Sequence, residues 1–119
     1  MKENKECIFC KIARREIPVE IVYESENFLA FPDAKPRCIG HTLIIPKKHF
    51  TNIMDLPDSL GSELMEVIKK VGEKRIREGA KGFNVINNCG EAAGQIVMHA
   101  HFHLLPRVGK EKVDFGCGV

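Results

Sequence analysis

The chain has 119 residues, enough for one domain with a hydrophobic core. Apolar residues make up 44% and charged residues 29%, with a formal net charge of +2, the ordinary balance of a soluble globular protein. This charge balance predicts no nucleic-acid surface. A membrane span needs about 18 consecutive apolar residues, and no apolar run in the chain approaches that length. The charged start, MKENKE, leads into no apolar signal core, so we expect a cytoplasmic protein.

The first half of the chain predicts a short helix followed by strands. Ile8, Phe9 and Ile12 give residues 7–15 an apolar side, and Pro18 ends that stretch through the restriction it places on the residue before it. Three β-rich runs follow, and we expect strands over residues 20–24, 28–33 and 41–46.

The second half predicts one long helix and two further strands. Residues 56–79 carry an apolar stripe at helical spacing, with Asp58 or Ser59 to cap its start and Gly79 to end it. Strands are expected over residues 82–88 and 96–106, joined by a glycine-bearing loop. Strands joined by short turns beside one long helix predict an α+β fold with an antiparallel sheet.

Three histidines, His99, His101 and His103, alternate in the last predicted strand. On a strand they share one face, and they span about 13 Å, which is too wide for all three to bind one ion. One imidazole can instead act as a nucleophile while its neighbours hold its tautomer and carry protons. Two alternatives stay open here, a zinc site built from two of the histidines with a ligand from elsewhere, and a solvated polar face.

The five cysteines stand at positions 7, 10, 38, 89 and 117, an odd number that argues against a disulfide framework. Cys7 and Cys10 form a Cys-x-x-Cys pair with no strand before it, so a thioredoxin-like redox role is not predicted. A structural zinc is one interpretation, with His49 as the candidate third ligand, and two buried thiols are the other. We assign no role to the remaining three cysteines.

Several segments resemble those of one family. GQIVMHAHFHLLPR resembles the histidine-triad signature, and CIFCKI, EIP, FLAFPD and GHTLIIPKKH are similar to its other hallmarks, in the same order from about residue 7 to 107. The chain therefore resembles the histidine triad (HIT) family, in its Hint-like branch of nucleotide phosphoramidases and nucleotidyl hydrolases. The resemblance implies a HIT-like fold, an antiparallel five-stranded sheet with one long and one short helix, as a single domain over residues 1–119 paired as a homodimer.

The implied activity is cleavage of the α-phosphate bond of purine nucleoside monophosphate derivatives through a covalent nucleotidyl-histidine. By resemblance His101 is the nucleophile and His103 lies beside the phosphate and leaving group, while His99 and His41 complete a proton network behind the nucleophile. Three alternatives stay open: a dinucleoside polyphosphate hydrolase, a nucleotide-binding regulatory protein with little catalysis, and a metal-dependent hydrolase that uses the histidines as zinc ligands.

The resemblance also implies the residues that bind the nucleotide. Asp33 would hold the ribose hydroxyls, although it could simply end a strand. The phosphate would meet Asn88, Gly94, Gln95 and the backbone N–H of Val97, and the base would enter an apolar slot of Ile8, Phe9, Ile12 and Ile17. Asn88 could instead only shape a turn, since asparagine favours turns.

Some bacterial relatives with this cysteine pair resemble zinc proteins, which implies a structural zinc held by Cys7, Cys10, His49 and His99. The chain departs from the family pattern at Ile96, where a hydroxyl residue often follows the glutamine and contacts the phosphate or leaving group. Ile96 has no hydroxyl, so this departure bears on turnover of substrates with amine leaving groups. Pro32 and Ala34 are smaller than the residues that flank the acidic position in animal members, so we expect a wider base pocket.

Overall fold

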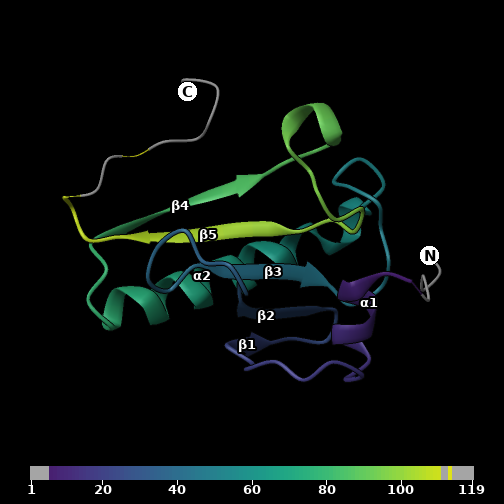
Figure 1. Cartoon of the computed structure of the whole chain (residues 1–119). Coiled ribbons are helices and arrows are strands. Elements are labelled where there is room, and N and C mark those ends of the chain that lie inside the picture. The colour runs from purple at the N-terminus through teal and green to yellow at the C-terminus, as the bar shows by residue number, and fades with distance from the viewer. Residues whose placement is uncertain (1–5, 111–112, 114–119) are drawn as a thin grey trace.

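The computed structural model describes residues 6–110 and 113, and a five-stranded sheet forms its centre (Figure 1). All neighbouring strands are antiparallel, as predicted, in the order β1-β2-β3-β5-β4. The strands are β1 (Tyr23–Glu24), β2 (Phe28–Pro32), β3 (Thr42–Pro46), β4 (Gly82–Asn87) and β5 (Phe102–Arg107). Because β5 lies between β3 and β4, residues at its start meet side chains from both.

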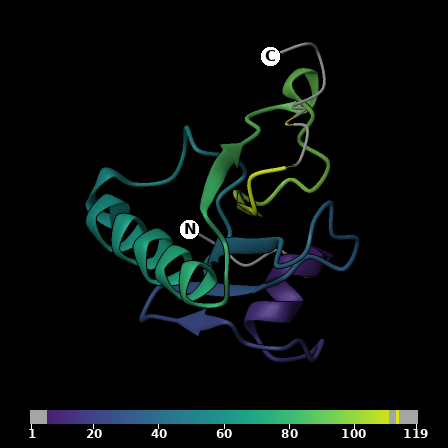
Figure 2. The same ribbon diagram turned by 90° about the vertical axis from the view of Figure 1, so that its left-hand side faces the viewer.

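Alternation along the strands gives the sheet two apolar faces, each covered by one helix. The long helix α2 (Gly61–Arg77) covers one face and the short helix α1 (Ile8–Ala13) lies against the other (Figure 2). The two buried clusters follow this division: Phe28, Ala30, Ile44, Phe102 and Leu104 pack with Val67 and Val71, whereas Leu29, Phe31, Leu43 and Ile45 pack with Phe9 and Ile12.

The predicted elements at the chain start are present but shorter than expected. The strand expected over 20–24 is the two-residue β1, and the helix ends at Ala13, before Pro18 can act. Arg15, at φ +67°, takes the chain out of the helix. Cys7 is the N-cap residue of α1, and its Sγ accepts a hydrogen bond from the backbone N of Cys10 at 3.4 Å. Cys-x-x-Cys therefore stabilises the start of this helix.

The long helix also starts later than predicted, because Asp58–Leu60 form a separate 3-10 turn, η1. The expected caps, Asp58 and Ser59, are wrong, since the N-cap position is Leu60 with no side-chain hydrogen bond. Gly79 follows the helix end at φ +117°, as expected for the residue after a helix. Neither α-helix of the described chain is long and apolar enough to cross a membrane.

The strand predicted over 96–106 is wrong in its first half, because β5 begins at Phe102. The register pairs Ile44 with Phe102, so continuing it would place Pro46 opposite Ala100, and Pro46 has no N–H to donate to a ladder. Instead, the backbone N of Ala100 donates to the carbonyl of Phe50 at 2.7 Å. His99 and His101 therefore lie on an irregular segment, and only His103 lies in the strand.

Candidate functional site

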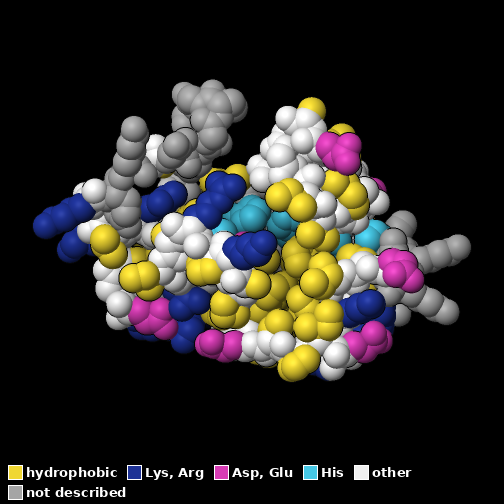
Figure 3. Space-filling model, in the orientation of Figure 1, with side chains coloured by type: hydrophobic (Ala, Val, Ile, Leu, Met, Phe, Trp, Pro, Cys, Tyr) yellow, Lys and Arg dark blue, Asp and Glu magenta, His cyan; other side chains and the backbone are white. Residues whose placement is uncertain are grey.

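Phe102 and Leu104 of β5 pack under α2, so His103 between them faces the other side of the sheet. Histidine side chains lie in a hollow between cationic and apolar side chains (Figure 3). His101 is 7% exposed, and its ring lies 5.1 Å from the ring of His103. Phe9 of α1 packs edge-on against His101, with ring centroids 5.2 Å apart. The helix thus packs directly against the histidine segment.

The hydrogen bond of His101 determines which of its ring nitrogens carries the proton. Its Nδ1 donates to the backbone carbonyl of His99 at 2.8 Å, which places the proton of the neutral ring on Nδ1 and the lone pair on Nε2. No hydrogen-bond partner for Nε2 is found among the described residues. The backbone carbonyl of His101 accepts a hydrogen bond from Asn87 Nδ2 at 2.9 Å. The sequence reasoning missed Asn87, whose only signal was its place at the end of a predicted strand.

A chain of hydrogen bonds determines the tautomer of His103. The backbone N–H of Arg37 donates to His41 Nδ1 at 3.0 Å, so the proton of neutral His41 is on Nε2. This Nε2 donates to His103 Nδ1 at 2.9 Å, and neutral His103 therefore keeps its proton on Nε2. His41 thus contacts His103, whereas the resemblance placed it behind His101.

Burial keeps this pair of rings neutral. It lowers the pKa of His103 to about 4, with His101 and His41 adding to the effect. Burial also lowers the pKa of His41, although the Asp33 carboxylate, 3.4 Å from His41 Nε2, opposes it. A neutral His103 offers an N–H hydrogen bond to a phosphoryl oxygen or leaving group.

Asp33, His41 and His103 bring three potential metal ligands together. A metal on His41 Nε2 would require a lone pair there, but the N–H of Arg37 already requires the lone pair on Nδ1. A neutral imidazole has only one such lone pair. This cluster therefore suits hydrogen bonding better than metal binding, which weakens the interpretation of the chain as a metal-dependent hydrolase.

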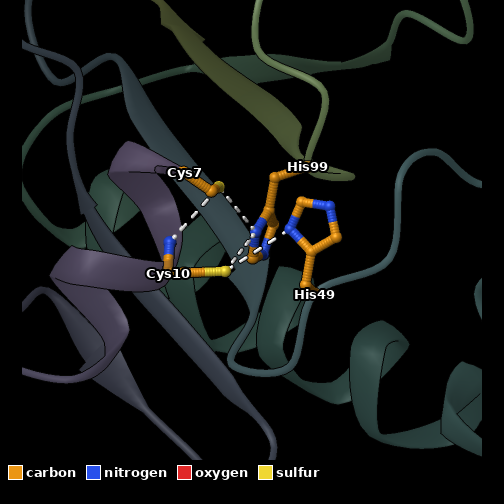
Figure 4. A group of neighbouring side chains, drawn as sticks. All are labelled: Cys7, Cys10, His49 and His99. Atoms are coloured by element: carbon orange, nitrogen blue, oxygen red, sulfur yellow. Dashed lines mark hydrogen bonds between the residues drawn. The ribbon is translucent and has the colours of Figure 1, made fainter. Parts of the chain in front are cut away.

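A second cluster joins Cys7, Cys10, His49 and His99, whose side chains point toward one another (Figure 4). His99 Nδ1 lies 3.3 Å from Cys7 Sγ and 3.6 Å from Cys10 Sγ, and His49 Nδ1 lies 3.4 Å from Cys10 Sγ. Tetrahedral zinc with normal bond lengths separates a sulfur from a nitrogen ligand by about 3.5 Å. The four residues could hold a metal ion with this geometry.

The tautomer of His99 agrees with that donor set. Its Nε2 donates to the carbonyl of Pro46 at 2.8 Å, which leaves the lone pair on Nδ1 facing the sulfurs. Burial lowers the pKa of His99 to about 4, so the ring is neutral near pH 7. The same ring could not also serve a proton network, since both its nitrogens have partners in this cluster and at Pro46.

The predicted phosphate residues lie on one loop, which contains the 3-10 turn η2 (Glu91–Ala93). A Cβ on Gly94 would lie 3.7 Å from Asn88 Nδ2, so these two residues are neighbours. Gln95 is 3% exposed, and its amide binds the backbone: Nε2 donates to the carbonyls of Thr51 and Val97, at 2.7 and 2.9 Å, and Oε1 accepts from Gly90 N at 2.7 Å. Gln95 thereby holds the loop, and its predicted phosphate contact stays a prediction.

The predicted base slot is apolar and partly assembled. Phe9 and Ile12 are buried in one cluster, with Ile17 and Val97 packed against it, whereas Ile8 is 48% exposed outside it. Asp33 lies at the end of β2, where its Oδ1 accepts from the backbone N of Lys35 at 2.8 Å. Ile96, the departure from the family pattern, is 88% exposed.

The chain is similar to known proteins over most of its length. The family model for the HIT domain matches residues 14–110, which include the three alternating histidines. The chain is 46% identical over 112 residues to an uncharacterized HIT-like protein of Methanocaldococcus jannaschii, covering 92% of this chain and 87% of that protein. It is 40% identical over 113 residues to the adenosine 5′-monophosphoramidase of Schizosaccharomyces pombe, covering 95% and 80%. A Zn-bound histidine triad family protein of Mycobacterium smegmatis has a similar structure, with a TM-score of 0.84, 37% identity and coverage of 92% and 81%.

Proposed function

Because this chain belongs to the HIT family, we propose that it is a nucleotide hydrolase of the phosphoramidase type, a single HIT domain over residues 1–119. It would cleave the α-phosphate bond of purine nucleoside monophosphate derivatives. The observation that carries the proposal is His101, whose Nδ1 donates to the His99 carbonyl at 2.8 Å and whose Nε2 is left with the lone pair. The relative named adenosine 5′-monophosphoramidase supports the choice of substrate.

The proposed reaction has two displacements at phosphorus. His101 Nε2 attacks the α-phosphorus, the leaving group departs, and a nucleotidyl-histidine remains. Water then attacks the same phosphorus and releases the nucleoside monophosphate. His103 donates its Nε2–H as a hydrogen bond to the phosphoryl group in both steps, where charge develops on oxygen.

Phe9, Ile12 and Ile17 would contact the purine, and Asp33 the ribose. Asn88, Gly94, Gln95 and the backbone N–H of Val97 would surround the phosphate, and His41 would keep His103 in its tautomer. The closeness of Asn88 to Gly94 and the apolar cluster around Phe9 support this placement. Ile8 would contribute only the outer rim of the slot, because it is 48% exposed.

We propose zinc for the cluster of Cys7, Cys10, His49 and His99, supported by the sulfur–nitrogen distances of 3.3–3.6 Å and by the Zn-bound relative. A zinc with these four ligands has no open position for substrate and would be structural. Elemental analysis should find about one zinc per chain and none in the Cys7→Ser/Cys10→Ser double variant. Cys7, Cys10, Cys38 and Cys89 form no disulfide with one another, which suits a reducing compartment such as the cytoplasm.

A nucleoside 5′-phosphoramidate assay with a denaturing quench tests the function. The wild type should release nucleoside monophosphate and form a nucleotidyl adduct on the peptide that contains His101. His101→Ala should bind the nucleotide but turn over at least about 100-fold more slowly. Equal turnover by His101→Ala, or turnover without the adduct, would favour the metal-dependent hydrolase. Nucleotide binding without turnover by the wild type would favour the nucleotide-binding regulatory protein.

A further inference from the structure

We propose that Cys7, Cys10 and His49 are positioning residues for the nucleophile, acting through His99. The inference rests on the proposed function, because it takes His101 as the group that attacks phosphorus. It concerns how the cysteine cluster affects catalysis, and it holds whether the sulfurs meet His99 directly or through a metal ion.

His99 belongs to both sites at once. Its side-chain Nδ1 lies 3.3 Å from Cys7 Sγ and 3.6 Å from Cys10 Sγ. Its backbone carbonyl accepts the Nδ1–H of His101 at 2.8 Å, the bond that leaves the lone pair on the attacking nitrogen. A single residue therefore connects the orientation of the cluster to the tautomer of the nucleophile.

This connection is effective because residues 99–101 lie outside the sheet. In a strand the ladder would hold the His99 carbonyl whatever its side chain did. Here the hydrogen bonds that the segment makes with the described residues, apart from those to the sulfurs and within it, are Ala100 N to the carbonyl of Phe50 at 2.7 Å, His99 Nε2 to the carbonyl of Pro46 at 2.8 Å and Asn87 Nδ2 to the carbonyl of His101 at 2.9 Å. Among these three, none is made by the His99 carbonyl. Phe50 directly follows His49, so the cluster is also adjacent to the main-chain contact of Ala100.

The cluster also sets the position of α1 against the nucleophile. Cys7 and Cys10 lie at the start of this helix, and Phe9 between them packs edge-on against His99 and His101, with ring centroids 5.8 and 5.2 Å apart. Loss of a sulfur would remove one contact of His99 Nδ1, and a shift of the ring about its remaining bond to Pro46 would move the His99 carbonyl away from His101 Nδ1–H. The proton could then occupy either nitrogen, and the attacking form would be less populated.

The expected effect falls more on chemistry than on nucleotide binding. Cys7→Ser and Cys10→Ser should slow nucleotidyl-His101 formation in single-turnover rapid quench by about 10- to 100-fold, the range for a misplaced reacting group. The Kd for nucleoside monophosphate should rise by a smaller factor than the rate falls, because the sulfurs do not themselves line the nucleotide site, although α1 also carries part of the base slot. Cys89→Ser is the matched control, since Cys89 is exposed and outside the cluster, and it should keep the wild-type rate.

A second measurement separates positioning from general stability. The Nδ1–H proton of His101, observed by NMR at a temperature well below the melting point of each variant, should lose its hydrogen-bonded signal in the two cysteine variants and keep it in Cys89→Ser. His49→Asn provides a further variant if a cysteine variant does not fold.

Three results would overturn the inference: an unchanged rate in the folded variants, a parallel loss of rate and binding with the His101 signal intact, or unfolding of every cluster variant. If the wild type itself forms no adduct on His101, the proposed function fails as well. If the wild type and the cysteine variants form the adduct at equal rates, only the positioning role fails.

Discussion

His101 and His103 are neighbours with opposite tautomers. His101 donates from Nδ1 to a carbonyl, whereas His103 accepts at Nδ1 from His41. In the neutral rings, Nε2 of His101 therefore carries a lone pair, whereas Nε2 of His103 carries a proton. A nucleophile beside a hydrogen-bond donor is what attack on a phosphoryl group requires.

Stability should fall on acidification because His103 is buried as a neutral ring. Its pKa of about 4 lies below the about 6.5 of an unfolded histidine, so the unfolded chain binds the extra proton first. The stability that this ring contributes is complete above about pH 6.5 and is lost as the pH falls toward 4. The free energy of unfolding in urea should fall between pH 7 and 4.5, and His103→Gln should make this fall smaller by up to about 3 kcal/mol. The same loss in both proteins would show that His103 is not protected from protons.

Asn87 should matter for turnover because its Nδ2 donates to the backbone carbonyl of His101. Asn87→Ala removes one hydrogen bond worth about 1 kcal/mol, so we expect kcat to fall about fivefold with little change in KM. Asn84→Ala is the control, since Asn84 also lies on β4 but binds Arg107 Nε at 2.9 Å. Equal effects of the two substitutions on kcat would contradict the assignment.

Among the elements, α2 and β4 meet at Gly72, where the helix needs a residue without a side chain. A Cβ at this position would lie 2.5 Å from two ring atoms of Phe83. Val67 and Val71 on the same helix pack against the strands that carry the site. The helix α2 therefore packs closely on the face of the sheet opposite the histidines.

Gly72→Ala should destabilise the protein by about 1–3 kcal/mol, because Phe83 must move to accept the methyl group. Gly61→Ala at the start of the same helix has nothing within 4 Å of the added Cβ. It should leave the Tm unchanged or raise it slightly, since alanine favours a helix more than glycine does. Thermal unfolding measures both, and a neutral Gly72→Ala would contradict the packing.

At the scale of the whole molecule, the sheet has a closed face under α2 and a functional face under α1. Its edges are β1, with two residues, and β4, with six. A long edge strand presents unpaired backbone groups that can pair with another chain. Val85 in β4 is 42% exposed, and we propose this edge as the homodimer contact that the family resemblance implies.

Val85→Arg should convert a dimer into a monomer of 13.4 kDa in sedimentation velocity, because a charge at the edge opposes pairing. Ile39→Arg is the control, since Ile39 is 96% exposed on the loop between β2 and β3 and should leave the dimer intact. A wild type that sediments as a monomer would contradict the proposed contact.

Much of the fold could be predicted from local patterns. The β-rich apolar runs around Phe28–Pro32 and Thr42–Pro46 predicted two of the strands, and the helical stripe of α2 predicted the long helix. Element ends were less predictable, because they depend on neighbours along the sheet. Pro46 is the clearest case: it lies opposite the histidine segment and ends the ladder there, although 53 residues separate it from His99.

The sequence by itself determined the family, the strand-and-helix content and the identity of the histidines and cysteines, since these follow from residue types at short spacing. Only the tertiary structure decided which nitrogen of each imidazole is free, because the partners of these rings, Arg37, Pro46 and the cysteines, come from other segments. It also decided that His99 faces the sulfurs while its carbonyl holds His101. These contacts depend on strand register and on the bend before β5, and neither can be predicted from the spacing of residues within one segment.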